Sequence, residues 1–183
     1  MGHIRNETII KNVQVDIQPN LGLDGDARRE VVKILNHTIA TETGLTIKTR
    51  IAHWNVRGRS YFEQRGLLSS QYEQLNQITE KLAERIRMLG EIAIDGLQEF
   101  LNNFKLDDLR RDAPDINELL AAHEVAIRSL REDAKKCSEE HGDEVTRQFL
   151  VEILFQHEKM AWNLRSYYES RPFFGESQEG NNG

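Results

Sequence analysis

Apolar residues recur at helical spacing in four long stretches of the chain, separated by glycine, proline or charged turns. The first stretch runs from about Asp26 to Trp54, and Asp26 is its expected N-cap. The second starts with a capping-box pattern from Ser60 to Glu63 and ends at Gly90, the expected C′ residue. Its apolar positions recur in steps of three, four or seven residues, at Leu68, Tyr72, Leu75, Leu82, Ile86 and Leu89. We therefore expect two long helices joined by a short link.

The third and fourth stretches predict a second pair of helices. Pro114 suits the first helical position of the third helix, which we expect to end near Gly142. Asp143 is the expected N-cap of the fourth helix, which runs from about Glu144 to Glu169. The dipeptide Arg171-Pro172 would then end this helix, because a proline disfavours helical conformation in the residue before it.

The lengths of the connections predict how the helices are arranged. Roughly 20 residues join the second helix to the third, a crossover of the kind seen in helical bundles. They include a short amphipathic piece from Ile92 to Phe104. Short links make each pair antiparallel, and the long one lets the third helix run parallel to the second. The pattern predicts an all-α, ferritin-like four-helix bundle over residues 21–171, with a short helix in the crossover. Residues 1–20 and 172–183 are expected to be flexible tails.

Composition narrows the classes of function. The 183 residues include 24 basic and 30 acidic side chains, which gives a net charge of -6. Neither end of the chain is a basic arm, so we do not expect DNA binding at neutral pH. No apolar run approaches the ~20 residues that a membrane span needs. The single cysteine, Cys137, excludes a disulfide within the chain. These features indicate a cytoplasmic protein without a membrane partner.

Two histidines in the last two helices bear on metal binding inside the bundle. A di-iron site within a four-helix bundle usually needs a Glu-x-x-His motif on each of two helices. His123 and His157 lack this motif, because Leu120 and Leu154 stand three residues before them. We therefore expect no ordinary di-iron site inside the bundle, and hydrogen-bonded packing for both histidines.

A set of short motifs is spread along all four expected helices. They are Lys48-Thr49-Arg50, Ala52 to Gly58 with its His53-Trp54-Asn55, Gln71-Tyr72, Ala83-Glu84-Arg85, Ala122-His123-Glu124, Leu130 to Asp133 and His157 to Trp162. Together they resemble the Dps family, the mini-ferritins of bacteria. The resemblance covers about residues 21–168 without large gaps, and this spread makes it more specific than any single motif.

The resemblance implies a fold, an assembly and an activity. Members of this family form hollow homo-dodecamers. They take up Fe2+, oxidise it with peroxide or oxygen, and store it as a ferric mineral, so that iron and peroxide no longer generate hydroxyl radicals. By resemblance the chain would be a homo-oligomeric ferroxidase, an oxidoreductase acting on metal ions, with iron as its metal.

The family's oxidation centre lies between two subunits, and its ligand positions can be followed along this sequence. The resemblance assigns His53 and, from the other subunit, Glu80 and Glu84 as metal ligands. Glu80 stands where the family has an aspartate. Arg65 and Ser69 stand where it has a histidine and an aspartate.

These substitutions predict a weakened or silent oxidation centre. Arginine has no lone pair for a metal, and serine is a weak neutral ligand beside a carboxylate. We expect Arg65 to occupy the place of the iron and to pair with Glu80 or Glu84 of the other subunit. Two other readings remain open. One is a non-catalytic structural cage or DNA-associated protein of the same fold, and the other is an active ferroxidase with a different ligand set.

Acidic residues gather at the turn between the third and fourth helices: Glu139, Glu140, Asp143 and Glu144. The family resemblance implies that this turn lines pores at the three-fold axes, where iron enters. A ring of such segments would concentrate cations. A solvated helix end with capping carboxylates explains the same residues equally well.

Overall fold

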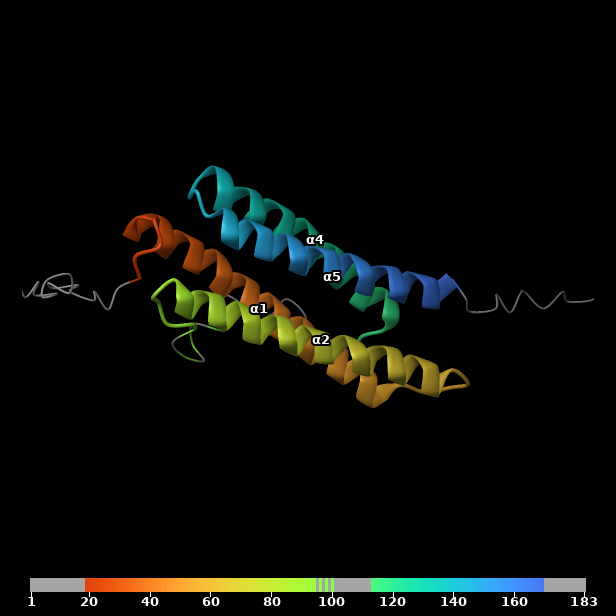
Figure 1. Ribbon diagram of the computed structural model, residues 1–183. Coiled ribbons are helices and arrows are strands. Elements are labelled where there is room, and N and C mark those ends of the chain that lie inside the picture. Colours follow the sequence, from red (N-terminus) through yellow and green to blue (C-terminus); the bar gives the residue numbers. More distant parts are fainter. Residues whose placement is uncertain (1–18, 95, 97, 99, 101–112, 170–183) are drawn as a thin grey trace, which may run out of the picture.

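The computed structural model describes residues 19–94, 96, 98, 100 and 113–169, and every regular element in this part of the chain is helical. Four long helices make up the molecule: α1 (Gly25–Asn55), α2 (Tyr61–Met88), α4 (Ile116–Glu139) and α5 (Glu144–Glu169). Figure 1 shows them lying side by side as a bundle. The predicted all-α four-helix architecture is therefore confirmed.

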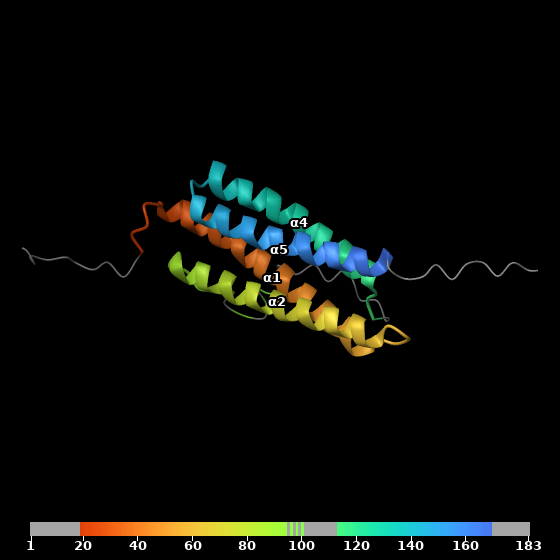
Figure 2. The same ribbon diagram turned by 45° about the vertical axis from the view of Figure 1, so that its right-hand side comes forward.

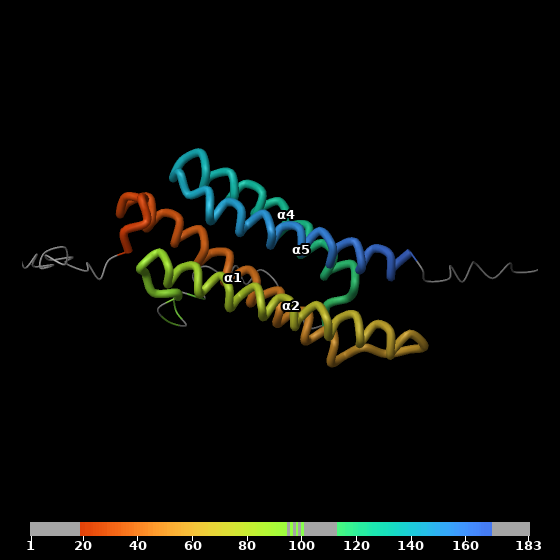
Figure 3. The backbone as a smooth tube through the Cα atoms, in the orientation of Figure 1, coloured from red at the N-terminus to blue at the C-terminus, as the bar shows by residue number. Residues whose placement is uncertain are grey.

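The bundle consists of two helical hairpins, α1 with α2 and α4 with α5, and α1 also contacts α4. The two hairpins form separate layers in both ribbon views (Figures 1 and 2). Arg28 at the start of α1 donates to the Leu89 carbonyl at the end of α2, with 3.2 Å between the atoms. Tyr167 near the end of α5 donates to the Ser60 carbonyl before α2, at 3.4 Å. These contacts make α2 antiparallel to both α1 and α5, so α4 runs parallel to α2 as predicted (Figure 3).

Three of the predicted helix starts are wrong in detail, and two of these lie in the first hairpin. The N-cap of α1 is Asp24, whose carboxylate accepts from the Ala27 amide at 2.8 Å, because Asp24 holds the extended backbone that a cap requires. Asp26 lies inside the helix and pairs with Arg29. Ser60 occupies the N-cap position of α2, but its φ of -89° and ψ of 24° are not extended and its side chain makes no capping hydrogen bond.

The second hairpin is capped by two aspartates. Asp115 and Glu118 form a capping box at the start of α4, with hydrogen bonds of 2.9 and 3.0 Å in the two directions. Pro114 therefore precedes the N-cap and is not the first helical residue. Asp143 caps α5, as predicted, by accepting from the Thr146 amide at 2.9 Å.

The end of α2 follows the prediction. Gly90 has a φ of +89°, in the left-handed region, and its amide donates to the Arg87 carbonyl at 3.1 Å. The Glu91 amide donates to the Ile86 carbonyl at 3.3 Å, which completes a Schellman motif. An added Cβ at Gly90 would lie 2.6 Å from the Pro19 ring, so both backbone conformation and space require glycine here.

Much of the crossover and of both tails lies outside the described residues. Of the predicted short helix from Ile92 to Phe104, Gln98 and Phe100 are helical, Ile92 to Ile94 are not, and most of the rest is not described. The expected tails, 1–20 and 172–183, are likewise undescribed except for residues 19 and 20. In the described part, no helix has the length and apolarity that a membrane crossing demands.

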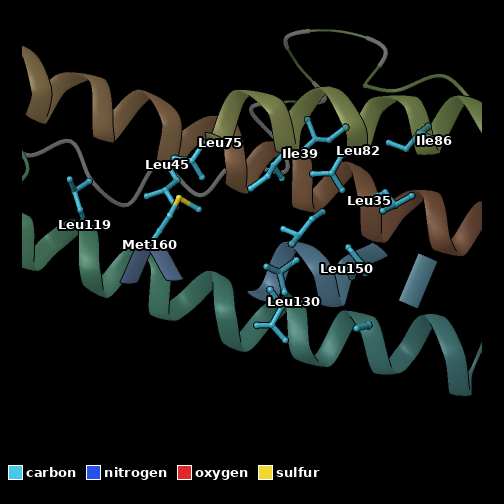
Figure 4. Close-up of a cluster of buried hydrophobic side chains, with 14 of the residues drawn as sticks. Leu35, Ile39, Leu45, Leu75, Leu82, Ile86, Leu119, Leu130, Leu150 and Met160 are labelled. Atoms are coloured by element: carbon cyan, nitrogen blue, oxygen red, sulfur yellow. The ribbon is translucent and has the colours of Figure 1, made fainter. Parts of the chain in front are cut away.

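All four helices contribute to the core, as Figure 4 shows for ten labelled side chains. The predicted stripe of α2 is buried except for Tyr72, which is half-buried. The buried face of α1 is more polar than the buried faces of the other three helices. The buried hydroxyls of Thr38, Thr46 and Thr49 donate to carbonyls four residues earlier at 2.8–3.0 Å, which satisfies them within the helix. Fully buried side chains of the core include Leu35, Leu68, Leu75, Leu82, Leu119, Leu150 and Met160.

Candidate metal centre

His53 lies in the last turn of α1 and is 8% exposed. Its ring meets the Tyr72 ring edge-on, with 5.4 Å between centroids. Its Nδ1 is buried and has no hydrogen-bond partner among the described residues. Burial, and then the positive charge of Arg65, lower the pKa of His53. A neutral imidazole with an unused nitrogen is the form that binds a metal.

Arg65 lies on α2 close to His53, and its guanidinium is held by Tyr61. Nη1 donates to the Tyr61 hydroxyl at 3.1 Å, and the guanidinium carbon lies 5.6 Å from the centre of the Tyr61 ring. A second guanidinium, from Arg50, lies 5.1 Å from the centre of the Tyr72 ring. The surroundings of His53 within one chain are therefore cationic. Ser69, one turn after Arg65, has its hydroxyl 3.5 Å from a Glu73 carboxylate oxygen.

Glu80 and Glu84 are exposed, and both lie near the other end of α2. Fifteen residues separate Arg65 from Glu80, about 22 Å along the helix at 1.5 Å per residue. Across the described residues, no group of three or more His, Cys, Asp and Glu side chains converges to hold a metal. One chain therefore brings His53 and Arg65 together and leaves the two glutamates apart from them. The half of the site with His53 and Arg65 carries a positive charge, and the half with Glu80 and Glu84 carries negative charge.

The acidic turn between α4 and α5 divides into exposed and buried carboxylates. Glu139, Glu140 and Glu144 are exposed. Glu144 accepts from the Ser138 hydroxyl and from Arg147, and these two contacts, in this order, lower its pKa. Glu139 lies 3.7 Å from Lys135 of its own helix.

Asp143 faces the interior of the bundle, not solvent. Its two carboxylate oxygens accept from Nη2 of Arg85 at 3.0 and 2.9 Å. They also accept from the amide and hydroxyl of Thr146, at 2.9 and 2.6 Å. Arg85 donates to the same hydroxyl through Nε at 2.9 Å. This network ties the end of α2 to the start of α5. Sequence reasoning found the cap but missed Arg85 as its partner.

Residues 32–171 match the model of the ferritin-like domain family. A DNA protection during starvation protein from Agrobacterium fabrum is 30% identical over 156 residues, which cover 81% of this chain and 94% of that protein. The chain belongs to the Dps family of ferritin-like proteins.

Two further comparisons give another relative and a structural neighbour. An uncharacterised low-temperature-induced protein from a Nostoc species is 33% identical over 157 residues, covering 84% of this chain and 88% of the relative. The crystal structure of a Dps protein from Vibrio cholerae, described as a member of the ferritin-like diiron-carboxylate superfamily, superposes with a TM-score of 0.74 at 22% identity. It covers 84% of this chain and 98% of that one, and supports the same fold.

The middle of the bundle holds a buried polar cluster of His123, His157 and Glu42. The sequence predicted only part of it. Nδ1 of His123 and Nδ1 of His157 are 3.0 Å apart, so the histidines are hydrogen-bonded as expected. Nε2 of His157 also contacts the buried carboxylate of Glu42. Glu42 stands seven residues after Leu35 and seven before Thr49, both buried, and this heptad phase is the signal that could have placed it in the core.

Several large apolar side chains are exposed on the single Dps-family chain. Trp54 is 68% exposed and Trp162 is 60% exposed, so neither is a core residue of the chain itself. Phe62 and Phe155 are also exposed. Trp54 and Phe62 adjoin His53 and Tyr61 in sequence, which places apolar surface beside the candidate metal centre. Exposed aromatic surface of this kind is typical of an interaction site.

Proposed function

We propose that the protein is a Dps-type mini-ferritin with an altered oxidation centre. Copies of the chain assemble into a hollow dodecamer in the cytoplasm, which takes up Fe2+ and stores it as ferric mineral. Withdrawal of free iron limits hydroxyl-radical formation. Membership of the Dps family supports this assignment, and the exposed aromatic residues Trp54, Phe62, Phe155 and Trp162 support an assembly that covers them.

The proposal of an altered oxidation centre rests on the environment of Arg65. In the proposed assembly, Glu80 and Glu84 of a second copy approach His53 and Arg65 of the first. The opposite charges of the two halves favour this pairing. The guanidinium offers a carboxylate two parallel hydrogen bonds, so the contact between copies persists without a metal.

The remaining donor atoms fit one iron ion better than two. His53 offers an unpaired buried nitrogen, and two glutamates offer hard oxygen ligands. Arg65 adds a positive charge beside this set and has no lone pair. Iron oxidation is therefore slow in this protein, and mineral growth relies on carboxylates elsewhere in the cage. The exposed Glu139, Glu140 and Glu144 line the route by which cations enter.

The test compares Fe2+ oxidation by the wild-type protein and by an Arg65→His/Ser69→Asp variant, with oxygen and then with hydrogen peroxide. We expect the variant to oxidise iron at least ~10-fold faster, the scale on which ligand-shell changes alter metal sites. The matched control is Arg87→His/Ser70→Asp. It makes the same two changes at exposed positions of the same helix and leaves the rate near that of wild type.

Two outcomes would contradict the proposal in different ways. A wild-type rate equal to that of the double variant means that the chain oxidises iron with another ligand set. If both proteins stay at background and hold no ferric mineral after iron loading, the chain is a non-catalytic cage. Gel retardation of duplex DNA by the same samples at low and high salt would then identify a DNA-associated role.

A further inference from the structure

Three titratable side chains from three different helices meet in the centre of the bundle. Glu42 comes from α1, His123 from α4 and His157 from α5, and all three are fully buried. Nε2 of His157 lies 3.0 Å from one carboxylate oxygen of Glu42 and 3.1 Å from the other. On the opposite side of the ring, its Nδ1 lies 3.0 Å from Nδ1 of His123. The proposed iron chemistry uses none of these groups.

Each of the two short contacts in the trio needs one proton between its partners. Two imidazole nitrogens only 3.0 Å apart attract each other when one carries a proton and the other accepts it, and repel each other when both or neither do. The contact between His157 and Glu42 needs a second proton. With these two protons alone, the buried trio has the net negative charge of the carboxylate. A third proton makes it neutral, as an ion pair of Glu42 with His157 beside an uncharged His123.

Burial favours the neutral, three-proton state, because an uncompensated charge in a bundle core is costly. A fourth proton placed on His123 would make its ring a cation. Protonated nitrogens of His123 and His157 would then face each other, and this contact could not persist. Burial, and then the charge of His157, accordingly lower the pKa of His123 to about 3. The contact between α4 and α5 at this point therefore depends on His123 remaining uncharged.

A small cavity adjoins Glu42, one member of the trio. Glu42 lines a cavity of about 10 Å³ between α1 and α4, room for about one water molecule. Thr41 and Ser129, both half-buried, line the same cavity, as does Asp133. Asp133 accepts from Ser129 at 3.2 Å and lies 3.5 Å from Lys136, so its charge is balanced on its own helix. In the described residues α2 adds no charged partner to the trio.

We infer that Glu42, His157 and His123 form a proton-operated lock, which holds α1, α4 and α5 together at neutral pH and opens when acid adds one more proton. The pKa of His123 determines the direction in which pH shifts the opening of the lock. Its pKa is lowered in the folded bundle and ordinary, near 6.5, once the bundle opens. Opening therefore takes up one proton between about pH 6.5 and pH 3. The lock is intact above this window, and the equilibrium constant for opening rises up to ~10-fold for each pH unit within it.

The decisive variant is His123→Asn, whose side-chain oxygen can replace Nδ1 as the acceptor for His157 but cannot take up a proton. Urea unfolding is measured from pH 7 to pH 4 for both proteins. We expect unfolding of the variant to take up one proton fewer than unfolding of wild type. Its unfolding constant should therefore change up to ~10-fold less per pH unit. The matched control, His141→Asn at the half-buried turn histidine, keeps the wild-type slope. An equal shift of stability at every pH would overturn the lock, because it is the signature of packing alone.

A second measurement tests the lock in the wild-type protein, in case His123→Asn does not fold. Solid-state NMR of the assembled protein labelled with 15N-histidine reports which ring nitrogens carry protons. We expect, at pH 7, one buried histidine protonated at both nitrogens, with a through-space contact between the two Nδ1 atoms. In acid the contact between the two Nδ1 atoms should be lost as the uncharged histidine becomes protonated. Absence of the contact at pH 7, or its survival when both rings are protonated, would refute the inference.

Discussion

Replacing Asp143 with alanine is the sharpest test of how the end of α2 is joined to the start of α5. The Asp143 side chain is 1% exposed and that of Arg85 is 13% exposed, so the pair is buried. Asp143→Ala removes a helix cap worth ~1 kcal/mol and leaves a buried guanidinium unpaired, a loss of 3–5 kcal/mol in typical cases. Because one carboxylate serves both roles, the two losses overlap. We expect a total of about 4 kcal/mol.

The assay is urea unfolding followed by circular dichroism, combined with a double-mutant cycle. Arg85→Met/Asp143→Ala removes both charges, and an apolar side chain of similar length fills part of the space. We expect the double variant to be at least ~2 kcal/mol more stable than Asp143→Ala alone, because no buried charge remains uncompensated. The control is Glu140→Ala in the same turn, which is exposed and should change stability by less than ~0.5 kcal/mol.

The same variants separate a structural carboxylate from a pore carboxylate. If Asp143→Ala costs less than ~1 kcal/mol and shows no coupling to Arg85, the buried pair described above is wrong. Replacing a carboxylate that lines a pore would slow iron entry and leave stability unchanged. We expect that behaviour from Glu140→Ala and not from Asp143→Ala.

Two further predictions concern local backbone geometry. Gly90→Ala should destabilise the protein by at least ~1 kcal/mol, because its φ is positive and the new Cβ would meet Pro19, whereas Gly66→Ala, on an exposed helical site with open space, should stabilise it by up to ~1 kcal/mol. Thermal unfolding of both variants checks this pair of opposite signs, and a stabilised Gly90→Ala would contradict it. Asp115→Ala should cost ~1 kcal/mol and Ser60→Ala less than ~0.5 kcal/mol, since the first side chain caps its helix and the second does not. Equal losses in urea unfolding would show that the two caps do not differ.

The number, order and direction of the helices could be predicted from the sequence, because apolar periodicity and connection length determine them directly. Helix starts were harder to predict. Asp143 was identified correctly as a cap. Asp26 lies two residues after the actual N-cap of α1, Pro114 lies two residues before the first residue of α4, and Ser60 makes no capping bond. Whether a residue caps a helix depends on one backbone angle, and periodicity does not report it.

The membership of the candidate site stays a prediction from the family resemblance, and the sequence did not indicate the contacts around it. Motif resemblance proposed His53, Arg65, Glu80 and Glu84 as members of the site, but it did not indicate that Tyr61 holds the Arg65 guanidinium. The partner of His157 was missed because Glu42 lies 115 residues away in the chain. Its place in a threonine-rich stretch of α1 also made that face look solvated. A buried polar face is hard to recognise when its hydroxyls are satisfied within their own helix.

The exposure of both tryptophans has a practical consequence for spectroscopy. Trp54 and Trp162 are the only tryptophans of the chain, and each has most of its indole in solvent when a single chain is considered. Folding of one chain therefore changes the polarity around them little, whereas burial against another copy changes it strongly. The intrinsic fluorescence of this protein should report association, with emission moving to shorter wavelength as copies assemble. Far-ultraviolet circular dichroism reports the helices, so the two signals together can resolve folding from assembly in one sample.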